Sequence, residues 1–245
     1  MVIKKQDVET QAVAVYGTGA DELAAVLAES LTPGEALTPE LLPTIKIPAA
    51  GGRNWELPDG TAAQTVSGVI LHRQTPRSYW SKAFGEGEQN AAPDCHSTDG
   101  VVGIGWYDGA HFDADGNQLN PGGRCAGCPM AEYGSGKGNS QACRQLTRLF
   151  LLREGDVLPT AVVLPPSSYT AGRAYALQAV NLGGLSHVVT TIGLEQDKNP
   201  DGITYSRATF HAGPKLEKEQ LASVQAYRAA ILPYLRAMAP VAEVV

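Results

Sequence analysis

The chain has 245 residues and a mass of 25.8 kDa, which is enough for one substantial hydrophobic core or for one domain with a large insertion. Hydrophobic residues make up 43%, but no apolar run approaches the roughly 18 residues of a membrane span, so we expect a soluble globular protein. The formal net charge of -6 excludes a uniformly basic nucleic-acid coat, and only a local basic surface remains compatible with that class.

The charge is unevenly distributed along the sequence. Residues 1–42 contain two Lys against seven Asp and Glu, a local balance of -5. From Arg124 to Arg153 five Lys and Arg face only Glu132, a balance of +4. We therefore expect an acidic amino-terminal segment that could act as a partner-binding or self-masking arm, and a basic surface in the middle of the chain.

The first predicted elements are a helix followed by short strands. Apolar residues recur at helical spacing from Leu23 to Leu31, with Asp21 as a candidate cap. Alternating or β-branched runs then predict strands over residues 44–47, 54–57 and 65–71. These strands follow one another closely, with a turn at residues 58–60, as in a small β-rich domain.

Residues 83–142 are rich in Gly, Asn, Asp and Ser. Such a segment cannot bury enough apolar surface to offset the entropy of ordering its backbone. We therefore expect it to fold only with outside help, and a bound metal ion would supply it.

The pattern of ordinary elements resumes after this segment. Apolar runs predict strands over residues 146–152 and 160–164, and helical spacing predicts a helix over 169–180. Two further runs, 187–194 and 203–210, flank a turn-forming sequence and predict a hairpin. A closing helix is expected over 215–238, with Pro233 kinking or interrupting its last turns.

These elements predict an α+β fold, namely a β-rich barrel like that of oligonucleotide-binding domains, with a zinc-tied loop insertion and helices at both ends. The expected organisation is an acidic helical segment at residues 1–42, the barrel domain at 43–212 and a carboxy-terminal helix at 213–245. The zinc-binding insertion is expected at about residues 83–145.

Four cysteines form the whole thiol inventory: Cys95, Cys125, Cys128 and Cys143. They fall within 49 residues in the order C-x29-C-x2-C-x14-C. The two-residue spacing of the central pair lets one tight turn aim both sulfurs at a single ion, and Gly127 removes a crowding Cβ from that turn. The pattern predicts one structural zinc ion with a closed shell of four thiolates and no position for a substrate.

The sequence is less compatible with three other interpretations of the cysteines. Two disulfides conflict with a polar amino-terminal sequence, from which we expect a reducing cytoplasm. A redox pair lacks the strand and helix that usually flank it, since Gly and Pro surround this pair. A zinc deaminase needs a Glu where Ser97 stands, and Cys143 would fill the site of its catalytic water. Replacement of one cysteine ligand by His96 stays open.

A second signal is a run of basic and aromatic residues from His72 to Lys82, which contains no acid. Aromatic rings stack on the bases of single strands, and Lys and Arg neutralise phosphates. The candidate nucleic-acid contacts are Arg53, Trp55, Arg73, Arg77, Tyr79, Trp80, Lys82, Arg144, Arg148 and Arg207. The alternative for each aromatic residue is packing in the core, and for each Arg a solvated surface or an ion pair.

Several segments together carry a resemblance: residues 44–48, 69–80, 93–95, 125–129 and 192–210. They resemble zinc-containing single-stranded DNA-binding proteins of phage and mobile-element replication modules, over about residues 41–212. The resemblance implies an oligonucleotide-binding barrel with a zinc subdomain that binds without sequence preference. The strongly acidic tail of many such proteins is absent, because residues 237–245 contain one acid, Glu243.

Two functions from different classes follow. The first is a cytoplasmic single-stranded DNA-binding protein of a phage-infected or bacterial cell, with replication or recombination proteins as partners. The second is a zinc-stabilised protein-interaction module, as in a virion component or an inhibitor of a host enzyme. No His, Asp or Glu set forms a catalytic constellation in the sequence, so we do not expect an enzyme. The oligomeric state is left undetermined.

Overall fold

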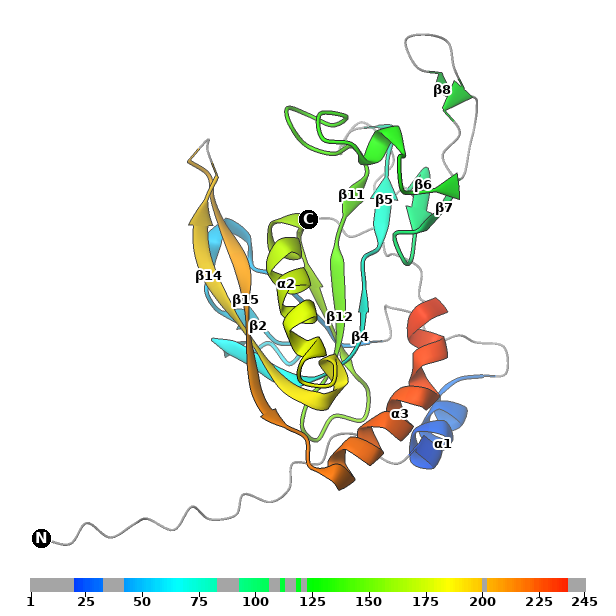
Figure 1. The fold of residues 1–245 in the computed structure, drawn as a ribbon, viewed down its shortest axis with the longest axis vertical. Coiled ribbons are helices and arrows are strands. Elements are labelled where there is room, and N and C mark those ends of the chain that lie inside the picture. Colours follow the sequence, from blue (N-terminus) through cyan, green and yellow to red (C-terminus); the bar gives the residue numbers. More distant parts are fainter. Residues whose placement is uncertain are drawn as a thin grey trace, which may run out of the picture.

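The computed structural model describes residues 20–32, 42–82, 93–105, 111–112, 118–119, 123–199 and 202–237. Its largest element is a six-stranded sheet in the order β1-β13-β12-β4-β14-β15 (Figure 1). The strands are β1 (Thr44–Lys46), β4 (Thr65–Gln74), β12 (Thr147–Leu152), β13 (Thr160–Leu164), β14 (Val188–Lys198) and β15 (Thr204–Lys215).

Pairing in this sheet is mixed. β1 runs parallel to β13, and the other neighbours are antiparallel. β1 and β15 stand at opposite edges, and the described strands form no barrel closed by hydrogen bonds. The predicted α+β class is therefore confirmed. The main sheet is open, so the predicted oligonucleotide-binding barrel is not confirmed.

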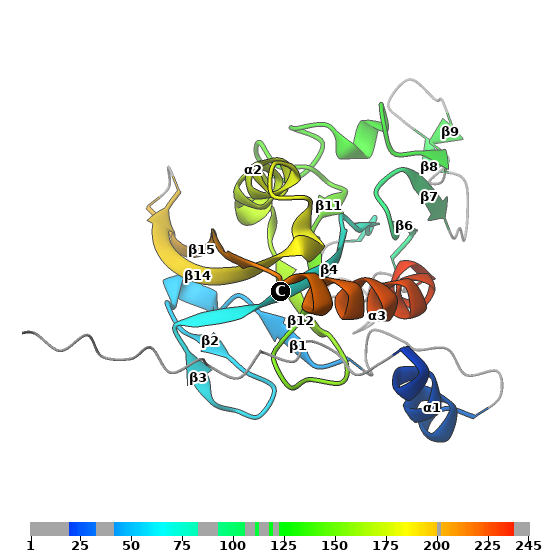
Figure 2. The same cartoon turned by 60° about the horizontal axis from the view of Figure 1, so that its bottom comes forward.

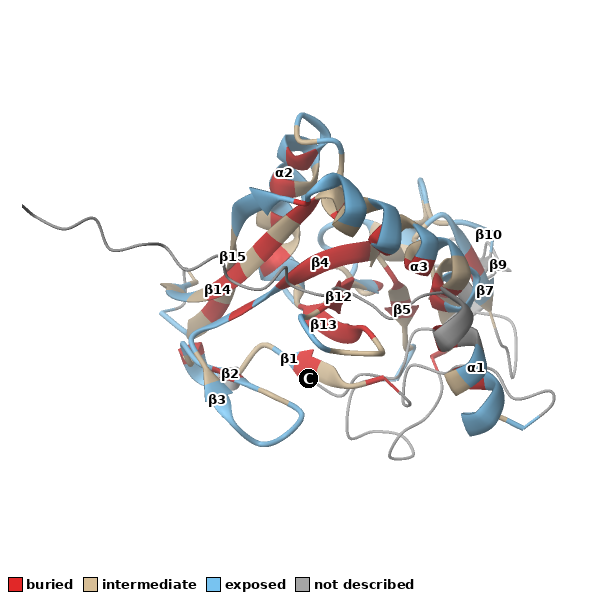
Figure 3. Ribbon diagram, turned by 90° about the horizontal axis from the view of Figure 1, so that it is seen from below, coloured by how far each residue is buried: buried red, intermediate tan, exposed pale blue. Residues whose placement is uncertain are grey.

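Hydrophobic side chains cover both faces of the sheet. On one face Val69, Phe150 and Leu152 pack with two helices, α1 (Ala20–Ser30) and α3 (Lys218–Ala237), which contact one another. On the other face Ile70 and Leu151 pack with α2 (Tyr169–Val180). The helices thus lie on opposite sides of the sheet (Figure 2), and the red strands in Figure 3 show how completely β12 and β13 are buried between them.

A short hairpin of β2 (Trp55–Glu56) and β3 (Ala62–Ala63) closes the core on the α2 side. Trp55 is fully buried there, and its indole N–H donates to the carbonyl oxygen of Ile192 at 3.1 Å. The hairpin is therefore held against the main sheet by the buried side chain of Trp55.

The cysteine-containing part of the chain forms a second sheet of five short strands in the order β10-β7-β6-β5-β11. These are β5 (Arg77–Tyr79), β6 (Cys95–Ser97), β7 (Val102–Gly105), β10 (Gly123–Arg124) and β11 (Arg144–Gln145). The pair β8 (His111–Phe112) and β9 (Gln118–Leu119) is separate. We call the five strands the small sheet.

Two strands of the main sheet run almost directly into the small sheet. β4 continues into β5 through Thr75 and Pro76, and β11 continues into β12 through Leu146. The amide of Leu146 donates to the carbonyl oxygen of Pro76 at 3.0 Å, so the ladder persists across the junction. This two-stranded ribbon positions the small sheet at one end of the molecule (Figure 1).

The terminal helices differ from expectation in detail. α1 begins at Ala20, which places Asp21 inside the helix and not at its cap. α3 continues through Pro233 to Ala237, where the exposed proline costs only one backbone hydrogen bond near the helix end. In the part of the chain that the structure describes, neither of these helices nor α2 is long and apolar enough to cross a membrane.

Candidate metal and nucleic-acid site

The four cysteines come from three separate places in the small sheet and its loop. Cys95 lies on β6, Cys125 and Cys128 follow β10, and Cys143 directly precedes β11. None of them forms a disulfide, and all four line one cavity of about 20 Å³. That volume holds one ion or water molecule, far less than the roughly 300 Å³ or more of an organic ligand pocket.

Backbone hydrogen bonds fix the positions of these thiols. The amide of Cys128 donates to the carbonyl oxygen of Cys125 at 3.3 Å, and Gly127 between them has φ +75°, a conformation that favours glycine. The Cys125 amide donates to the carbonyl oxygen of Val101, directly before β7, and the Cys143 amide donates to the carbonyl oxygen of Met130, beyond the turn. The turn is therefore tied to both sides of the cavity.

Strand register explains why the cavity has room. Directly paired residues point to the same face, and along a strand the faces alternate. Cys95 pairs with Tyr79 and Gly105, and Gly103 pairs with Gly123, so one face of the small sheet carries three glycines beside Cys95. We call this the inner face, since Gly103 and Gly123 line the cavity together with the cysteines.

Burial makes the cavity a poor place for a lone thiolate. Burial raises the pKa of Cys143 to about 11, and the nearby guanidinium of Arg77 opposes part of that rise. The pKa of Tyr79 is also raised, first by burial and then by Asp94 and the thiols of Cys128 and Cys143. Without a cation in the cavity Cys143 is therefore a neutral thiol at pH 7.

Arg77 is the charged group of the inner face. Its Nη2 donates to Oε1 of Gln145 at 2.6 Å, while its buried Nε and Nη1 have no hydrogen-bond partner. A buried guanidinium with unused donors is costly unless an anion lies beside it. Four thiolates around a divalent ion carry a net charge of −2, so the donor set and the guanidinium of Arg77, which lies beside Cys143 with donors to spare, fit such a group.

The side chains are not yet arranged as a formed coordination shell. Among the described residues no group of three or more His, Cys, Asp or Glu side chains is placed to hold a metal ion. Binding would therefore require the sulfurs to close in on the cavity they line. His96, the alternative ligand, also borders the cavity, but as the next residue after Cys95 on β6 its side chain leaves the strand on the opposite face.

Two predicted nucleic-acid contacts prove to be core residues. Trp55 has no exposed surface, so no base can stack on its ring. Arg148 lies on β12, where every residue is buried, and it is 2% exposed. Both assignments are corrected, because Trp55 packs in the core on the α2 side and Arg148 lies on the buried strand β12, between Gln74 and Val163.

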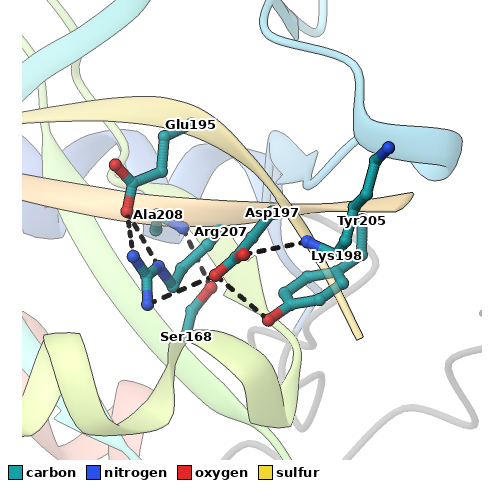
Figure 4. Close-up of polar contacts among 7 residues, drawn as sticks. All are labelled: Ser168, Glu195, Asp197, Lys198, Tyr205, Arg207 and Ala208. Atoms are coloured by element: carbon teal, nitrogen blue, oxygen red, sulfur yellow. Dashed lines mark hydrogen bonds and ion pairs between the residues drawn. The ribbon is translucent and has the colours of Figure 1, made fainter. Parts of the chain in front are cut away.

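Arg207 and Arg73 are engaged by other side chains. Arg207 pairs with Glu195 at 2.5 Å and with Asp197 at 3.5 Å across the β14–β15 hairpin, as Figure 4 shows. Two carboxylates thus already compensate the charge that a phosphate would meet. The guanidinium of Arg73 lies over the ring of Tyr169 at 5.5 Å, although its buried Nε and Nη2 lack partners.

The remaining predicted contacts divide between two places. Arg53 is exposed beside the β2–β3 hairpin, away from the cysteines in the chain. Tyr79 and Trp80 are half-buried, and Lys82 and Arg144 are exposed, all four on or next to β5 and β11 of the small sheet. With Arg77, which lines the cavity, the structure therefore gathers five of the ten candidates at or beside the cysteines.

Sequence reasoning missed a set of exposed residues on the same sheet. Val101, Val102 and Ile104 are 61%, 54% and 57% exposed, and Arg124 is exposed on the edge strand β10. A glycine-rich segment with isolated apolar residues gave no periodic signal. The adjacency of Arg124 to Cys125 was the available clue to its position.

Comparisons with known proteins do not assign this site. No family model, no curated protein and no solved structure matches the chain.

Proposed function

We propose that the protein binds single-stranded DNA without sequence preference, and that a zinc ion held by Cys95, Cys125, Cys128 and Cys143 orders its binding region. One observation carries the proposal: four thiols separated in the chain line one ion-sized cavity, in a small sheet whose strands contain three Arg, one His and no acid. The chain as a whole has a net charge of −6, so the small sheet is a place where positive charge is concentrated.

The metal half of the proposal follows from ligand chemistry. Sulfur-only sites select zinc or iron–sulfur clusters, and a cavity of about 20 Å³ favours a single ion over a cluster. A closed shell of four thiolates holds structure and offers no open position for catalysis. The proposed protein is accordingly a binding protein, and Arg77 would compensate part of the charge of the loaded site.

The nucleic-acid half follows from the residues around the cavity. Lys82 and Arg144 are exposed beside half-buried Tyr79 and Trp80, which pairs phosphate-binding groups with aromatic rings. Tyr133, in the loop between the cysteines, is 77% exposed and adds a further ring. Contacts to phosphates and to the faces of bases do not read sequence, which is why the proposed binding is non-specific.

The resemblance noted above supplies the biological setting of the proposal. It implies a role in a phage or mobile-element replication or recombination module, in the cytoplasm of a bacterial or infected cell. It also implies an oligonucleotide-binding barrel, but the proposal does not require a closed barrel, because the small sheet itself offers the strand-binding surface.

The experiment is a fluorescence-polarisation titration of the full chain with a labelled oligothymidine at a series of salt concentrations, with zinc content measured on the same sample. We expect one zinc per chain and an affinity that falls steeply with salt, since each neutralised phosphate releases counterions. Absence of binding at low salt by zinc-loaded protein would remove the DNA-binding function and leave the protein-interaction module as the better interpretation, which the exposed Val101, Val102 and Ile104 favour.

A further inference from the structure

We propose that the DNA strand lies on the outer face of the small sheet, opposite the cysteine cavity, and crosses the β-strands from Arg124 at one edge to Arg144 at the other. This inference rests on the proposed function and specifies where and how it is performed. It also assigns contact roles to Val102 and Ile104.

Strand register defines the outer face. Arg124 pairs with Val102, Ile104 pairs with His96, His96 pairs with Ser78, and Ser78 pairs with Arg144. Val102 and Ile104 are two residues apart on β7 and so share a side. The outer face therefore consists of Arg124, Val102, Ile104, His96, Ser78 and Arg144.

The outer face is accessible over most of its width. Val102 and Ile104 are more than half exposed, and both edge arginines are exposed. His96 is half-buried, and only Ser78 is buried, at 7%. Two exposed β-branched side chains next to one another on one face indicate a contact surface, because covering them removes apolar area from water and lowers the free energy.

The electrostatics of this face favour a polyanion over a protein of mixed charge. None of the five strands contains Asp or Glu. Two carboxylates flank β6 in the chain, Asp94 directly before it and Asp99 in the β6–β7 turn. Asp94 accepts a hydrogen bond from the amide of Ser81, and Asp99 accepts from the amides of Val101 and Val102 and from Ser97. The donors to Asp99 lower its pKa and disperse its charge.

The β14–β15 hairpin provides the contrast. There Arg207 is directly opposite Glu195 and is neutralised by it. Among the described residues no ion pair involves Arg124 or Arg144, and the residues directly opposite them are Val102 and Ser78. Their charges face solvent and are free to meet phosphates.

The spacing of the two arginines suits an extended single strand. β10 and β11 are separated by four inter-strand steps of about 4.8 Å, which is roughly 19 Å. A strand crossing that distance presents phosphates to both edges while its sugars and bases lie over Val102, Ile104 and His96. His96 and Arg124 border the metal cavity, but strand alternation directs their side chains to the outer face and that of Cys95 to the inner face. Zinc would therefore hold this face in shape from the opposite side without touching DNA.

The test compares salt dependence and affinity in single variants of the full, zinc-loaded chain, with oligothymidine as the probe. We expect Arg124→Gln and Arg144→Gln each to reduce the slope of log affinity against log salt by about 0.7, the value for one phosphate contact on a single strand. Val102→Ser and Ile104→Ser should each weaken binding about fivefold with the slope unchanged, because they remove only apolar contact.

Arg173→Gln is the matched control, since Arg173 is exposed on α2, which packs against β15 of the main sheet. It should leave affinity and slope unchanged, and each variant should retain one zinc per chain. Wild-type binding that is insensitive to all four outer-face variants would overturn this inference while leaving the proposed function intact. Failure of the wild type to bind would instead overturn the proposed function itself. Loss of binding in the apolar variants alone, with unchanged slopes in the arginine variants, would also contradict a strand path between the two arginines.

Discussion

The main sheet and the small sheet are built on different physical principles. Every residue of β12 and β13 is buried, and apolar side chains cover both faces of the main sheet. The small sheet has strands of two to four residues, of which Ser78, Ser97 and Gly103 are the buried members. Hydrophobic burial contributes little to these strands, and the proposed metal cross-link through the thiols would supply the difference.

Loss of the bound metal should have the largest effect, and it should be confined to the small sheet. Structural zinc contributes roughly 10 to 16 kcal/mol of apparent binding free energy, so the Cys125→Ser/Cys128→Ser double variant should lose most of the order of the small sheet. Hydrogen exchange should then show protection lost in residues 93–105 and 123–145 and kept in β12 to β14. Equal protection with and without metal would contradict a zinc-dependent small sheet.

A core substitution should produce the opposite pattern. Phe150 has no exposed surface and packs between β4 and α3, stacked on His72 at 6.0 Å. Phe150→Ala should lower the free energy of unfolding by about 3 to 5 kcal/mol, measured by urea denaturation. Zinc affinity under native conditions should stay within about twofold of wild type if the two regions are stabilised separately.

Arg77→Gln tests how far a single side chain supports the metal site of the small sheet. Removing the guanidinium beside the thiols should weaken zinc binding by 10- to 100-fold, as for other outer-shell partners of metal ligands. Competition with a chromophoric chelator measures this affinity, and the charge-transfer band of the cobalt-loaded protein reports the thiolate shell.

Arg77→Lys, which keeps the charge, should recover part of the affinity. Gln145 offers the matched control, since Gln145→Leu removes the hydrogen-bond partner of Arg77 and leaves the cation in place. Equal zinc affinities for wild type and Arg77→Gln would show that Arg77 does not compensate the site.

The smallest effect concerns pH and the main sheet. Burial first, then Arg236 and Arg228, lower the pKa of His72 from 6.5 to about 4. The unfolded chain therefore binds this proton at higher pH than the native protein does, and stability contributed by neutral His72 falls as pH drops from about 6.5 to about 4.

Because His72 is partly exposed, the loss should be no more than about 2 kcal/mol. Urea denaturation at pH 7 and pH 4.5 measures it, and His72→Gln should remove that component of the pH dependence. A wild-type stability that does not fall more steeply than that of His72→Gln would contradict a buried neutral imidazole.

Local patterns predicted the elements of the main sheet better than their arrangement. The apolar run at residues 160–164 and the turn-flanked runs of the late hairpin are strands β13, β14 and β15. That β1 lies parallel to β13 depends on contacts more than 110 residues apart in the chain, for example Thr44 with Ala161, and periodicity carries no such information. The order of strands in the open sheet therefore could not be predicted from local sequence patterns.

The candidate site divides in the same way. Cysteine spacing indicated that four thiols meet, and they line one cavity. The burial of Trp55 and Arg148 depends on which layers cover them, which residue type alone does not report. The outer face requires strand register, since Val102 and Ile104 acquire a common side only when β7 is paired.

The ribbon that joins the two sheets has an evolutionary consequence. The chain leaves the main sheet after Gln74 and returns at Thr147, and Gln74 is the direct neighbour of Arg148. Departure and return points one strand spacing apart are where a hairpin loop would ordinarily sit. The seventy or so residues between them can therefore be lengthened, exchanged for another module or reduced to a tight turn over time without disturbing how the α3 and α2 layers pack.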